Sequence, residues 1–410
     1  MLAGHHPSNT ILEESVAYQM PANNAYQLDP GPLDPSVLIG QLTHRSRDIW
    51  IGNDNMILNT RKCDGKFWDL VNEHLIHPRV LGVIKLSGLY GVYRSNRPVI
   101  DRSLISALVE RWRPDTHTFH FRTGESTITL QAVEILYGLP VKGNAVVGYE
   151  PQSSVVDWQN ICQRLLGFSP QPQDFKHSSL KVSALNAHLP LQPRLPDLVT
   201  PDMVNEKARH MCGLLKLMYL PMMENITTVG SYSWGSVTLA YLYRFLCRFI
   251  IIYYVQIWAW ERVTVLRPQI VEKRDTRNIF PGGLPRGPHA ARWYAHFSLT
   301  DTTKHVLRVF SNALDSMTKD QFIWEPYSSD IIESLPEYYR VGRDIWRARV
   351  PMFCWDVVEV HLPDRVMRQF GLVQAIPSSF AFDATHFNHD RRGRSNTNWD
   401  LEHAQWFEPY

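Results

Sequence analysis

The sequence predicts a mainly α-helical fold, with a single large helical domain, a few short β-strands or hairpins and long Pro-rich loops. Three observations support this prediction. Apolar residues recur at helical spacing in most segments between residues 64 and 370. Several of these segments begin at a capping residue and end at a glycine or proline. The chain has 410 residues, of which 44% are hydrophobic and 20% charged, and this is enough to bury a large core.

Residues 1–28 are polar and lack periodicity, so we expect a flexible N-terminal tail. The domain itself extends over residues 29–406. Its composition divides it into a helical block at 64–166, a Pro-rich loop at 167–204, a second helical block at 205–266, a basic loop at 267–289 and a C-terminal helical block at 290–406.

The first elements are helices with local start and stop signals. The segment "SVLIGQLTHRSRDIW" predicts a short helix that ends near Trp50, and "GKFWDLVNEHLI" carries one apolar helical face. Pro78 can occupy the first position of the next helix. Asp101 is a plausible N-cap for "RSLISALVERWR", and Pro114 ends that helix.

A short hairpin and a helix follow. The alternation in "HTFHFR", residues 117–122, predicts a strand, "GEST" a turn, and "TIT" an extended segment. Thr129 can cap the helix "LQAVEILYG", whose Gly138 lies where a C-terminal glycine is favoured. We therefore expect the order helix, hairpin, helix and glycine stop.

The second block contains the most apolar segment of the chain, "FIIIYYVQIWAW" at residues 249–260. It has twelve residues, whereas a membrane-spanning helix needs about 20. We interpret it as a buried helix and expect no membrane association. Upstream, Ser231 or Ser233 can cap a helix that begins near Trp234, and its aromatic stripe is typical of core packing.

The C-terminal block predicts helices near residues 302–317, 337–348, 352–360 and 363–370.

Composition excludes several classes of function. The net charge of +2 gives no bulk electrostatic attraction to nucleic acid. The five cysteines show no CxxC spacing, which argues against a zinc knuckle and for a reducing compartment. The sequence contains no GxxxxGK[ST], GxSxG or HExxH motif, and no GxGxxG after a strand. We therefore expect no catalytic, cofactor or metal site and no small-molecule substrate.

The stretch "HLPDRVMRQFG", residues 361–371, allows two interpretations. His361 and Asp364 could form an acid–base pair, and Arg365 and Arg368 could bind phosphate. Alternatively, the stretch is a short helix with a proline at its start, an acidic first turn, an apolar face and Gly371 at its end. We favour the structural interpretation, with Arg365 and Arg368 as candidate surface contacts.

A second candidate contact is "HDRRGRSNTNW", residues 389–399. Arg391, Arg392 and Arg394 flank a glycine and could meet nucleic-acid phosphates. Asp390 and Asp400 dilute this charge, so a solvated loop is the preferred interpretation.

Several blocks in order, among them "FRTGESTITLQAVEILYGLPVKG", "SYSWGSVTLAYLYRFLC", "FIWEPY" and "EVHLPDRVMRQFGLVQAIP", resemble the plant mobile domain, also called aminotransferase-like. The resemblance covers about residues 28–406. It implies a non-enzymatic nuclear protein linked to meristem maintenance, genome integrity and transposon or gene silencing. Its partners would be nuclear or chromatin-associated proteins. The alternative is a nucleic-acid-binding protein derived from a transposable element, and an unrecognised enzyme using His361, Asp364 and Arg365 is a third hypothesis.

Two segments depart from the family pattern. "GLLKLMYLP" and the link "RFIIIYY" between "YLYRFLC" and "QIWAWER" are shorter than usual. Missing helices would leave apolar faces of their neighbours uncovered.

Overall fold

The computed structural model describes residues 36, 38–51, 77–94, 100–150, 154–176, 179–181, 183–185, 200–212, 217–246, 252–268, 288–293, 307–382, 386 and 396–407. The expected N-terminal tail, the expected helix of the segment "GKFWDLVNEHLI" at 65–76 and most of the basic loop at 267–289 lie outside these residues. Where the chain is described, the mainly α fold with small antiparallel sheets is confirmed.

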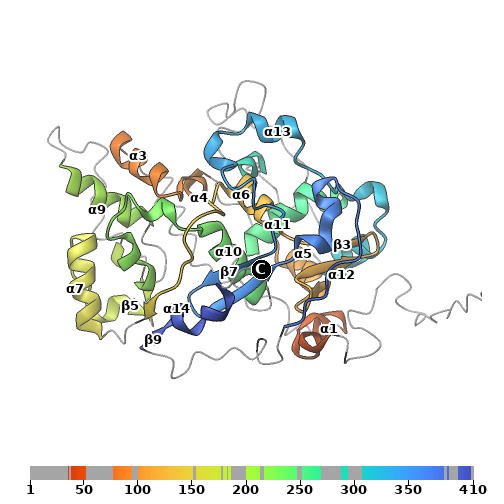
Figure 1. The fold of residues 1–410 in the computed structure, drawn as a ribbon, viewed down its shortest axis with the longest axis horizontal. Coiled ribbons are helices and arrows are strands. Elements are labelled where there is room, and N and C mark those ends of the chain that lie inside the picture. The colour runs from red at the N-terminus through yellow and green to blue at the C-terminus, as the bar shows by residue number, and fades with distance from the viewer. Residues whose placement is uncertain are drawn as a thin grey trace, which may run out of the picture.

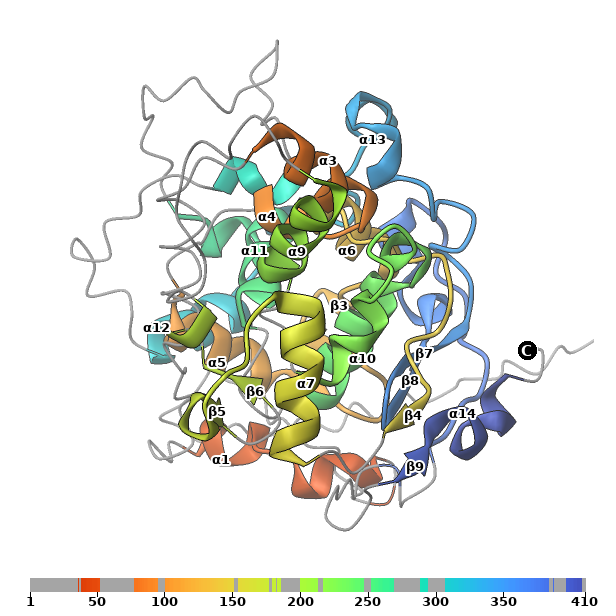
Figure 2. The same cartoon turned by 90° about the vertical axis from the view of Figure 1, so that its left-hand side faces the viewer.

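The helices and strands are distributed over the whole described chain (Figures 1 and 2). The helices are α1 Ser46–Trp50, α3 Pro78–Leu86, α4 Tyr90–Arg94, α5 Arg102–Glu110, α6 Leu130–Tyr137, α7 Val155–Leu166, α9 Pro201–Cys212, α10 Trp234–Phe245, α11 Ile252–Arg262, α12 Leu307–Asp315, α13 Ser329–Ser334 and α14 Trp399–Glu402. The strands are β1 Trp112–Arg113, β2 Thr118–Phe121, β3 Gly124–Ser126, β4 Tyr149–Glu150, β5 Phe175–Lys176, β6 Ser179–Leu180, β7 Val350–Cys354, β8 Val357–His361 and β9 Thr397–Asn398.

The predicted capping residues act as expected at two helices. The Asp101 side chain accepts hydrogen bonds from the backbone N–H groups of Ser103 and Leu104 and thereby starts α5. At α6 the Thr129 hydroxyl accepts from the N–H of Ala132, and Gly138 ends the helix with φ of +62°. Local sequence thus fixes both ends of α6.

The N-terminus of α10 is formed differently from the prediction. The helix begins at Trp234 as expected, but the Ser233 side chain makes no capping bond to it. Instead, the Ser233 hydroxyl donates to the backbone carbonyl of Val141. The serine therefore ties the start of α10 to the segment that follows α6.

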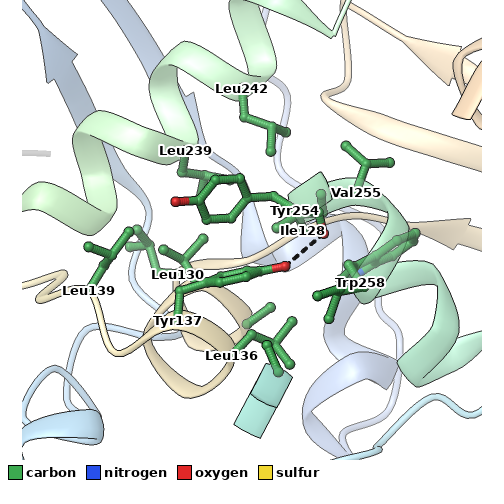
Figure 3. Close-up of a cluster of buried hydrophobic side chains, with 14 of the residues drawn as sticks. Ile128, Leu130, Leu136, Tyr137, Leu139, Leu239, Leu242, Tyr254, Val255 and Trp258 are labelled. Carbon is green, nitrogen blue, oxygen red and sulfur yellow. Dashed lines mark hydrogen bonds between the residues drawn. The ribbon is translucent and has the colours of Figure 1, made fainter. Parts of the chain in front are cut away.

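The main core lies between α6, α10 and α11 (Figure 3). Tyr137 of α6 donates a hydrogen bond of 3.2 Å from its hydroxyl to the backbone carbonyl of Tyr254 in α11. Leu239 and Leu242 of α10 and Trp258 of α11 are buried in the same cluster. A smaller cluster forms under α7 and contains Cys162, Leu165, Leu166, Leu217 and Leu220.

The apolar segment 249–260 gives α11, which is buried as predicted over its described side chains from Tyr254 to Trp260. In the described part of the chain no helix combines the length and apolar character needed to cross a membrane. Leu246 at the end of α10 is also buried. The shortened link between α10 and α11 was expected to leave apolar helix faces uncovered. The described residues at these two helix ends, Leu246 and Tyr254 to Trp260, are buried instead.

The prediction of a helix at 352–360 is wrong. These residues form the β7–β8 hairpin, in which Met352 pairs with Glu359 and Cys354 with Val357. The cause is visible in the sequence, because the β-branched residues Val350, Val357, Val358 and Val360 favour extended backbone.

Two other elements also differ from the prediction. The strand β3 occupies Gly124–Ser126, where a turn was expected, so the turn lies at residues 122–123. The expected helix at 337–348 reduces to a 3₁₀ turn at Glu337–Tyr339 followed by turns.

We predict that Gly138→Ala will lower the free energy of unfolding by at least about 2 kcal/mol. A β-carbon at this position would lie 1.9 Å from Cε1 of Tyr339, and the left-handed φ of +62° is unfavourable for L-residues. Urea denaturation of the purified chain measures the effect.

The matched control is Gly82→Ala in the interior of α3, where a β-carbon meets nothing within 4 Å. It should leave stability unchanged or raise it by about 1 kcal/mol at most. Equal destabilisation by both variants would contradict the assigned role of Gly138.

Candidate functional site

The stretch 361–371 forms a short helix as predicted, but the helix is 3₁₀ rather than α. This element, η14, covers Pro363–Phe370 and is broken at Val366, whose φ is −135° and ψ 38°. Gly371 ends it with φ of +71°. The proline entry and the glycine exit are therefore confirmed.

Gln369 is the main anchor of η14, a role that the sequence did not indicate. Its side-chain carbonyl accepts hydrogen bonds from the Ser126 hydroxyl at 2.7 Å and the Thr127 N–H at 2.6 Å. Its amide nitrogen donates to the Thr127 carbonyl at 2.8 Å. Because Gln369 is buried, these bonds replace the water that its amide loses on folding.

His361 is buried and is bonded to backbone groups on both sides. Nδ1 donates to the carbonyl of Ala348 at 3.0 Å, and Nε2 accepts from the N–H of Leu130 at 3.5 Å. Burial lowers the pKa of His361 to about 4, so the ring is neutral at pH 7. The histidine thus connects β8 to the start of α6.

Asp364 bonds to other groups than His361. Its Oδ2 accepts from Arg349 Nη2 at 2.7 Å and from the N–H of Ser378 at 3.0 Å. The two side chains of the suggested acid–base pair therefore have separate structural partners. The geometry of the enzyme hypothesis does not form between them.

The two arginines of this stretch differ in whether their charge is paired within the chain or exposed to solvent. Arg365 donates from Nε and Nη2 to the carboxylate of Glu125 at 3.0 and 2.9 Å, a bidentate pair. Arg368 is exposed, and its guanidinium carbon lies 5.5 Å from the centre of the Trp324 ring. Arg368 therefore presents its charge to solvent from a fixed aromatic support.

The three other candidate arginines, Arg391, Arg392 and Arg394, lie outside the described residues. Their suggested contact with phosphates stays a prediction.

The segment after η14, residues 371–378, is called the strap here. It has no regular secondary structure, and its apolar side chains face outward, with Val373 91% and Ile376 97% exposed. Gln374 fixes its backbone, because its side-chain oxygen accepts from the N–H of Met367 at 2.8 Å and its amide donates to the carbonyl of Asp364 at 2.7 Å. The strap is therefore an anchored segment that displays apolar side chains.

A pocket of about 200 Å³ opens on the side of α6 and is lined by Gln131, Glu325, Arg343, Trp346 and Arg347, among others. Ligand pockets for organic molecules usually enclose about 300–1,000 Å³. The pocket is small by that standard, and its size does not indicate a bound organic ligand.

A group of four charged or titratable residues gathers around Glu359 of β8, and we call it the Glu359 cluster. It comprises Glu359 of β8, Arg244 of α10, His117 of the β1–β2 turn and His386. Arg244 Nε lies 2.5 Å from Glu359 Oε1, and the Nε2 atoms of His117 and His386 each lie 2.9 Å from Glu359 Oε2.

Two effects act in opposite directions on the pKa of Glu359. Burial raises the pKa of a carboxyl group, but Arg244, His386 and His117 together hold the pKa of Glu359 well below its usual range. Burial also lowers the pKa of His386, against the pull of Glu359. Glu359 is therefore an ionised carboxylate beside a guanidinium.

Sequence reasoning did not single out any member of this cluster. Its residues are separated by more than a hundred positions in places, so no spacing connects them. The one local signal is a glutamate within the valine-rich strand "VVEVH", because a charged residue in a buried strand needs a partner.

Comparison with known proteins gives consistent matches. The family model described as plant mobile domain matches residues 88–410. A serine/threonine-protein phosphatase 7 long form homolog from Arabidopsis thaliana is 36% identical in an alignment that covers 93% of this chain and 29% of that protein. No solved structure matches.

Two further relatives from Arabidopsis thaliana are similar over most of the chain. Protein MAIN-LIKE 2 is 28% identical over 85% of this chain and 53% of its own length. Protein MAINTENANCE OF MERISTEMS is 29% identical over 86% of this chain and 74% of its own length. The chain thus spans only 29% and 53% of the long form homolog and of MAIN-LIKE 2, respectively.

We predict that His361 contributes to a loss of stability on acidification. Its pKa is about 4 in the folded chain and 6.5 in the unfolded chain, so its contribution is present above pH 6.5 and is lost as the pH falls towards 4. The contribution is of the order of 3 kcal/mol. The free energies of unfolding of the wild type and His361→Gln should therefore differ at pH 7 and converge near pH 4.5, as urea denaturation would measure.

Leu242→Ala in the buried core removes no titratable group and is the matched control, and its difference from the wild type should be the same at both pH values. A difference for His361→Gln that is equally independent of pH would show that the buried ring does not titrate as assigned.

Proposed function

Because the chain belongs to the plant mobile domain family, we propose that it is a nuclear protein that acts without catalysis, by binding other proteins. The processes served would be meristem maintenance, genome integrity and transposon or gene silencing. The name of the relative MAINTENANCE OF MERISTEMS supports the first of these. Since the chain spans 29% of the long form homolog, the phosphatase in that name supports no such activity here.

The single observation that carries the proposal is the anchored, apolar strap. Leu372, Val373 and Ile376 are all exposed large hydrophobic side chains, and they lie within five positions. Soluble proteins leave such groups of apolar side chains exposed mainly at interaction sites. The hydrogen bonds of Gln374 hold the backbone in place before binding, so little conformational entropy remains to be lost.

The neighbouring charge specifies the kind of partner. Arg368 precedes the strap by three positions and is exposed above Trp324, whereas Arg365 is neutralised by Glu125. We therefore expect a nuclear protein whose surface has an apolar groove for Val373 and Ile376, with a carboxylate at its edge that meets Arg368.

The absence of catalysis in the proposal rests on the side-chain contacts described above. His361 is bonded to backbone groups on both sides, and Asp364 is bonded to Arg349 and to the N–H of Ser378. Acid–base catalysis needs a group that can reach a substrate proton. Both ring nitrogens of His361 are engaged by backbone groups, and the bonds of Asp364 Oδ2 support a structural role for that carboxylate.

We predict that the double variant Val373→Asp, Ile376→Asp will fold normally but lose its protein partners. Each apolar anchor contributes about 2 kcal/mol in typical interfaces, so affinity should fall by more than about tenfold. The measurement is a pull-down from plant nuclear extract with the full chain as bait, with nuclease treatment of the extract, followed by mass spectrometry.

The matched control is Val156→Asp on α7, where the native valine is 61% exposed and lies outside the strap. It should retain the same partners as the wild type. Two results would contradict the proposal: an unchanged partner set in the strap variant, or a tagged chain confined to the cytosol of plant cells. Retention that nuclease abolishes and that Arg391→Ala, Arg392→Ala, Arg394→Ala also removes would favour the nucleic-acid alternative.

A further inference from the structure

The hydrogen-bonding state of His117 can be worked out from its neighbours. Its Nδ1 lies 3.1 Å from the backbone carbonyl of Val360. A carbonyl only accepts, so Nδ1 carries the proton, and in the neutral ring Nε2 has a lone pair. That lone pair faces Glu359 Oε2 at 2.9 Å, which is also an acceptor. Two acceptors at this distance need a cation between them, either a second ring proton or a metal ion.

His386 is placed differently. Its Nε2 lies 2.9 Å from Glu359 Oε2, which only accepts, and 2.9 Å from Arg244 Nη2, which only donates. The same Nη2 lies 3.4 Å from Nδ1, so it sits over the face of the ring and not on the in-plane axis of Nε2, and the neutral ring can donate from Nε2 to Oε2. With both rings neutral, the unsatisfied contact of the Glu359 cluster is therefore the one between His117 Nε2 and Glu359 Oε2.

We propose that His117, His386 and Glu359 bind one divalent transition-metal ion of the zinc class. Their ligand atoms, two imidazole nitrogens and one carboxylate oxygen, all lie within 4.8 Å of one another. Zinc binds such nitrogens at about 2.0–2.1 Å and such oxygens at about 2.0–2.2 Å, which places ligands of a tetrahedral site about 3.3 Å apart. The cluster reaches this geometry by small side-chain shifts, and water fills the fourth position.

The surroundings of the ligands fit this assignment. Metal-binding histidines usually donate their other N–H to a backbone carbonyl or carboxylate, as His117 does to Val360. Glu359 Oε1 is held by Arg244 Nε, which leaves Oε2 for the metal. The side chains of Arg244 and His386 are each 11% exposed, so an ion can enter from their side.

Arg244 is the competitor of the metal. Its Nη2 lies over the His386 ring, 2.9 Å from Nε2 and 3.4 Å from Nδ1, and its positive charge opposes that of the ion. Binding requires Nη2 to move away from His386 Nε2, while Nε can stay beside Glu359 Oε1. Removal of the guanidinium should therefore strengthen metal binding.

The site is structural in this assignment. It joins three segments that are distant in the chain: the β1–β2 turn, the strand β8 and the residue at position 386, which follows the strap. A bound ion would cross-link the residue at position 386 to β8 and to the β1–β2 turn.

The experiment titrates Co²⁺ into the purified full chain after chelator treatment and dialysis, and then displaces it with Zn²⁺. One equivalent of Co²⁺ should give the intense visible absorption typical of tetrahedral coordination, and Zn²⁺ should abolish it. His386→Gln and His117→Gln should each weaken binding by more than the about 10–100-fold that loss of an outer-sphere partner causes. Arg244→Gln should bind more tightly than the wild type.

His77→Gln is the control for surface histidines and should bind Co²⁺ as the wild type does. Melting temperatures establish that each variant is folded, and Zn²⁺ should raise that of the wild type but not that of His386→Gln. A wild type without one tight site, or a folded His386→Gln variant with unchanged affinity, would overturn the inference and leave a protonated His117 as the cation of the cluster.

Discussion

The ionised carboxylate of Glu359 is the constraint on which the C-terminal half of the structure depends. It is buried, and an unpaired charge in this position would be strongly destabilising. Arg244 provides the opposite charge from α10 at 2.5 Å. Removal of one partner of a buried pair leaves the other without solvation, which usually costs about 3–5 kcal/mol. The pair therefore fixes how β8 lies against α10.

The position of Glu359 on a strand extends this constraint to its neighbours. Side chains two positions apart on a strand lie on the same face, so Glu359 and His361 are brought together. One bonds to Arg244 of α10 and the other to the start of α6. β8 thus connects two helices that also pack against each other in the hydrophobic core. Polar and apolar contacts in this region support the same arrangement.

The parts of the fold that could be predicted are those fixed by adjacent residues. Asp101 and Thr129 cap their helices through bonds to backbone groups two or three positions away, and Gly138 supplies a conformation that other residues avoid. The apolar spacing predicts a helix at 352–360, where the structure has the β7–β8 hairpin of four valines. Propensity was the better guide there, since both strands are short and largely buried.

The Glu359 cluster could not be predicted because it exists only in the folded chain. His117, Arg244 and Glu359 come from different elements, and only Glu359 carries a local signal, as a charged residue within a valine-rich strand. Gln369 of η14 is a similar case, since its partners Ser126 and Thr127 are more than 240 positions away. Spacing rules detect sites within one helix or loop, whereas these groups meet through tertiary packing.

These contacts also connect the candidate interaction surface to the core. Asp364 accepts from Ser378 and bonds to Gln374 through its carbonyl, so the strap takes its position from η14. The position of η14 in turn is fixed by Gln369 against β3 and by His361 at the end of β8. A substitution at either anchor would therefore displace the strap without touching its exposed side chains. Loss of binding in such a variant would reflect the lost preorganisation of the strap. It could be told apart from the loss of an apolar contact in the strap itself, because a substitution at an anchor would also lower the stability of the folded chain.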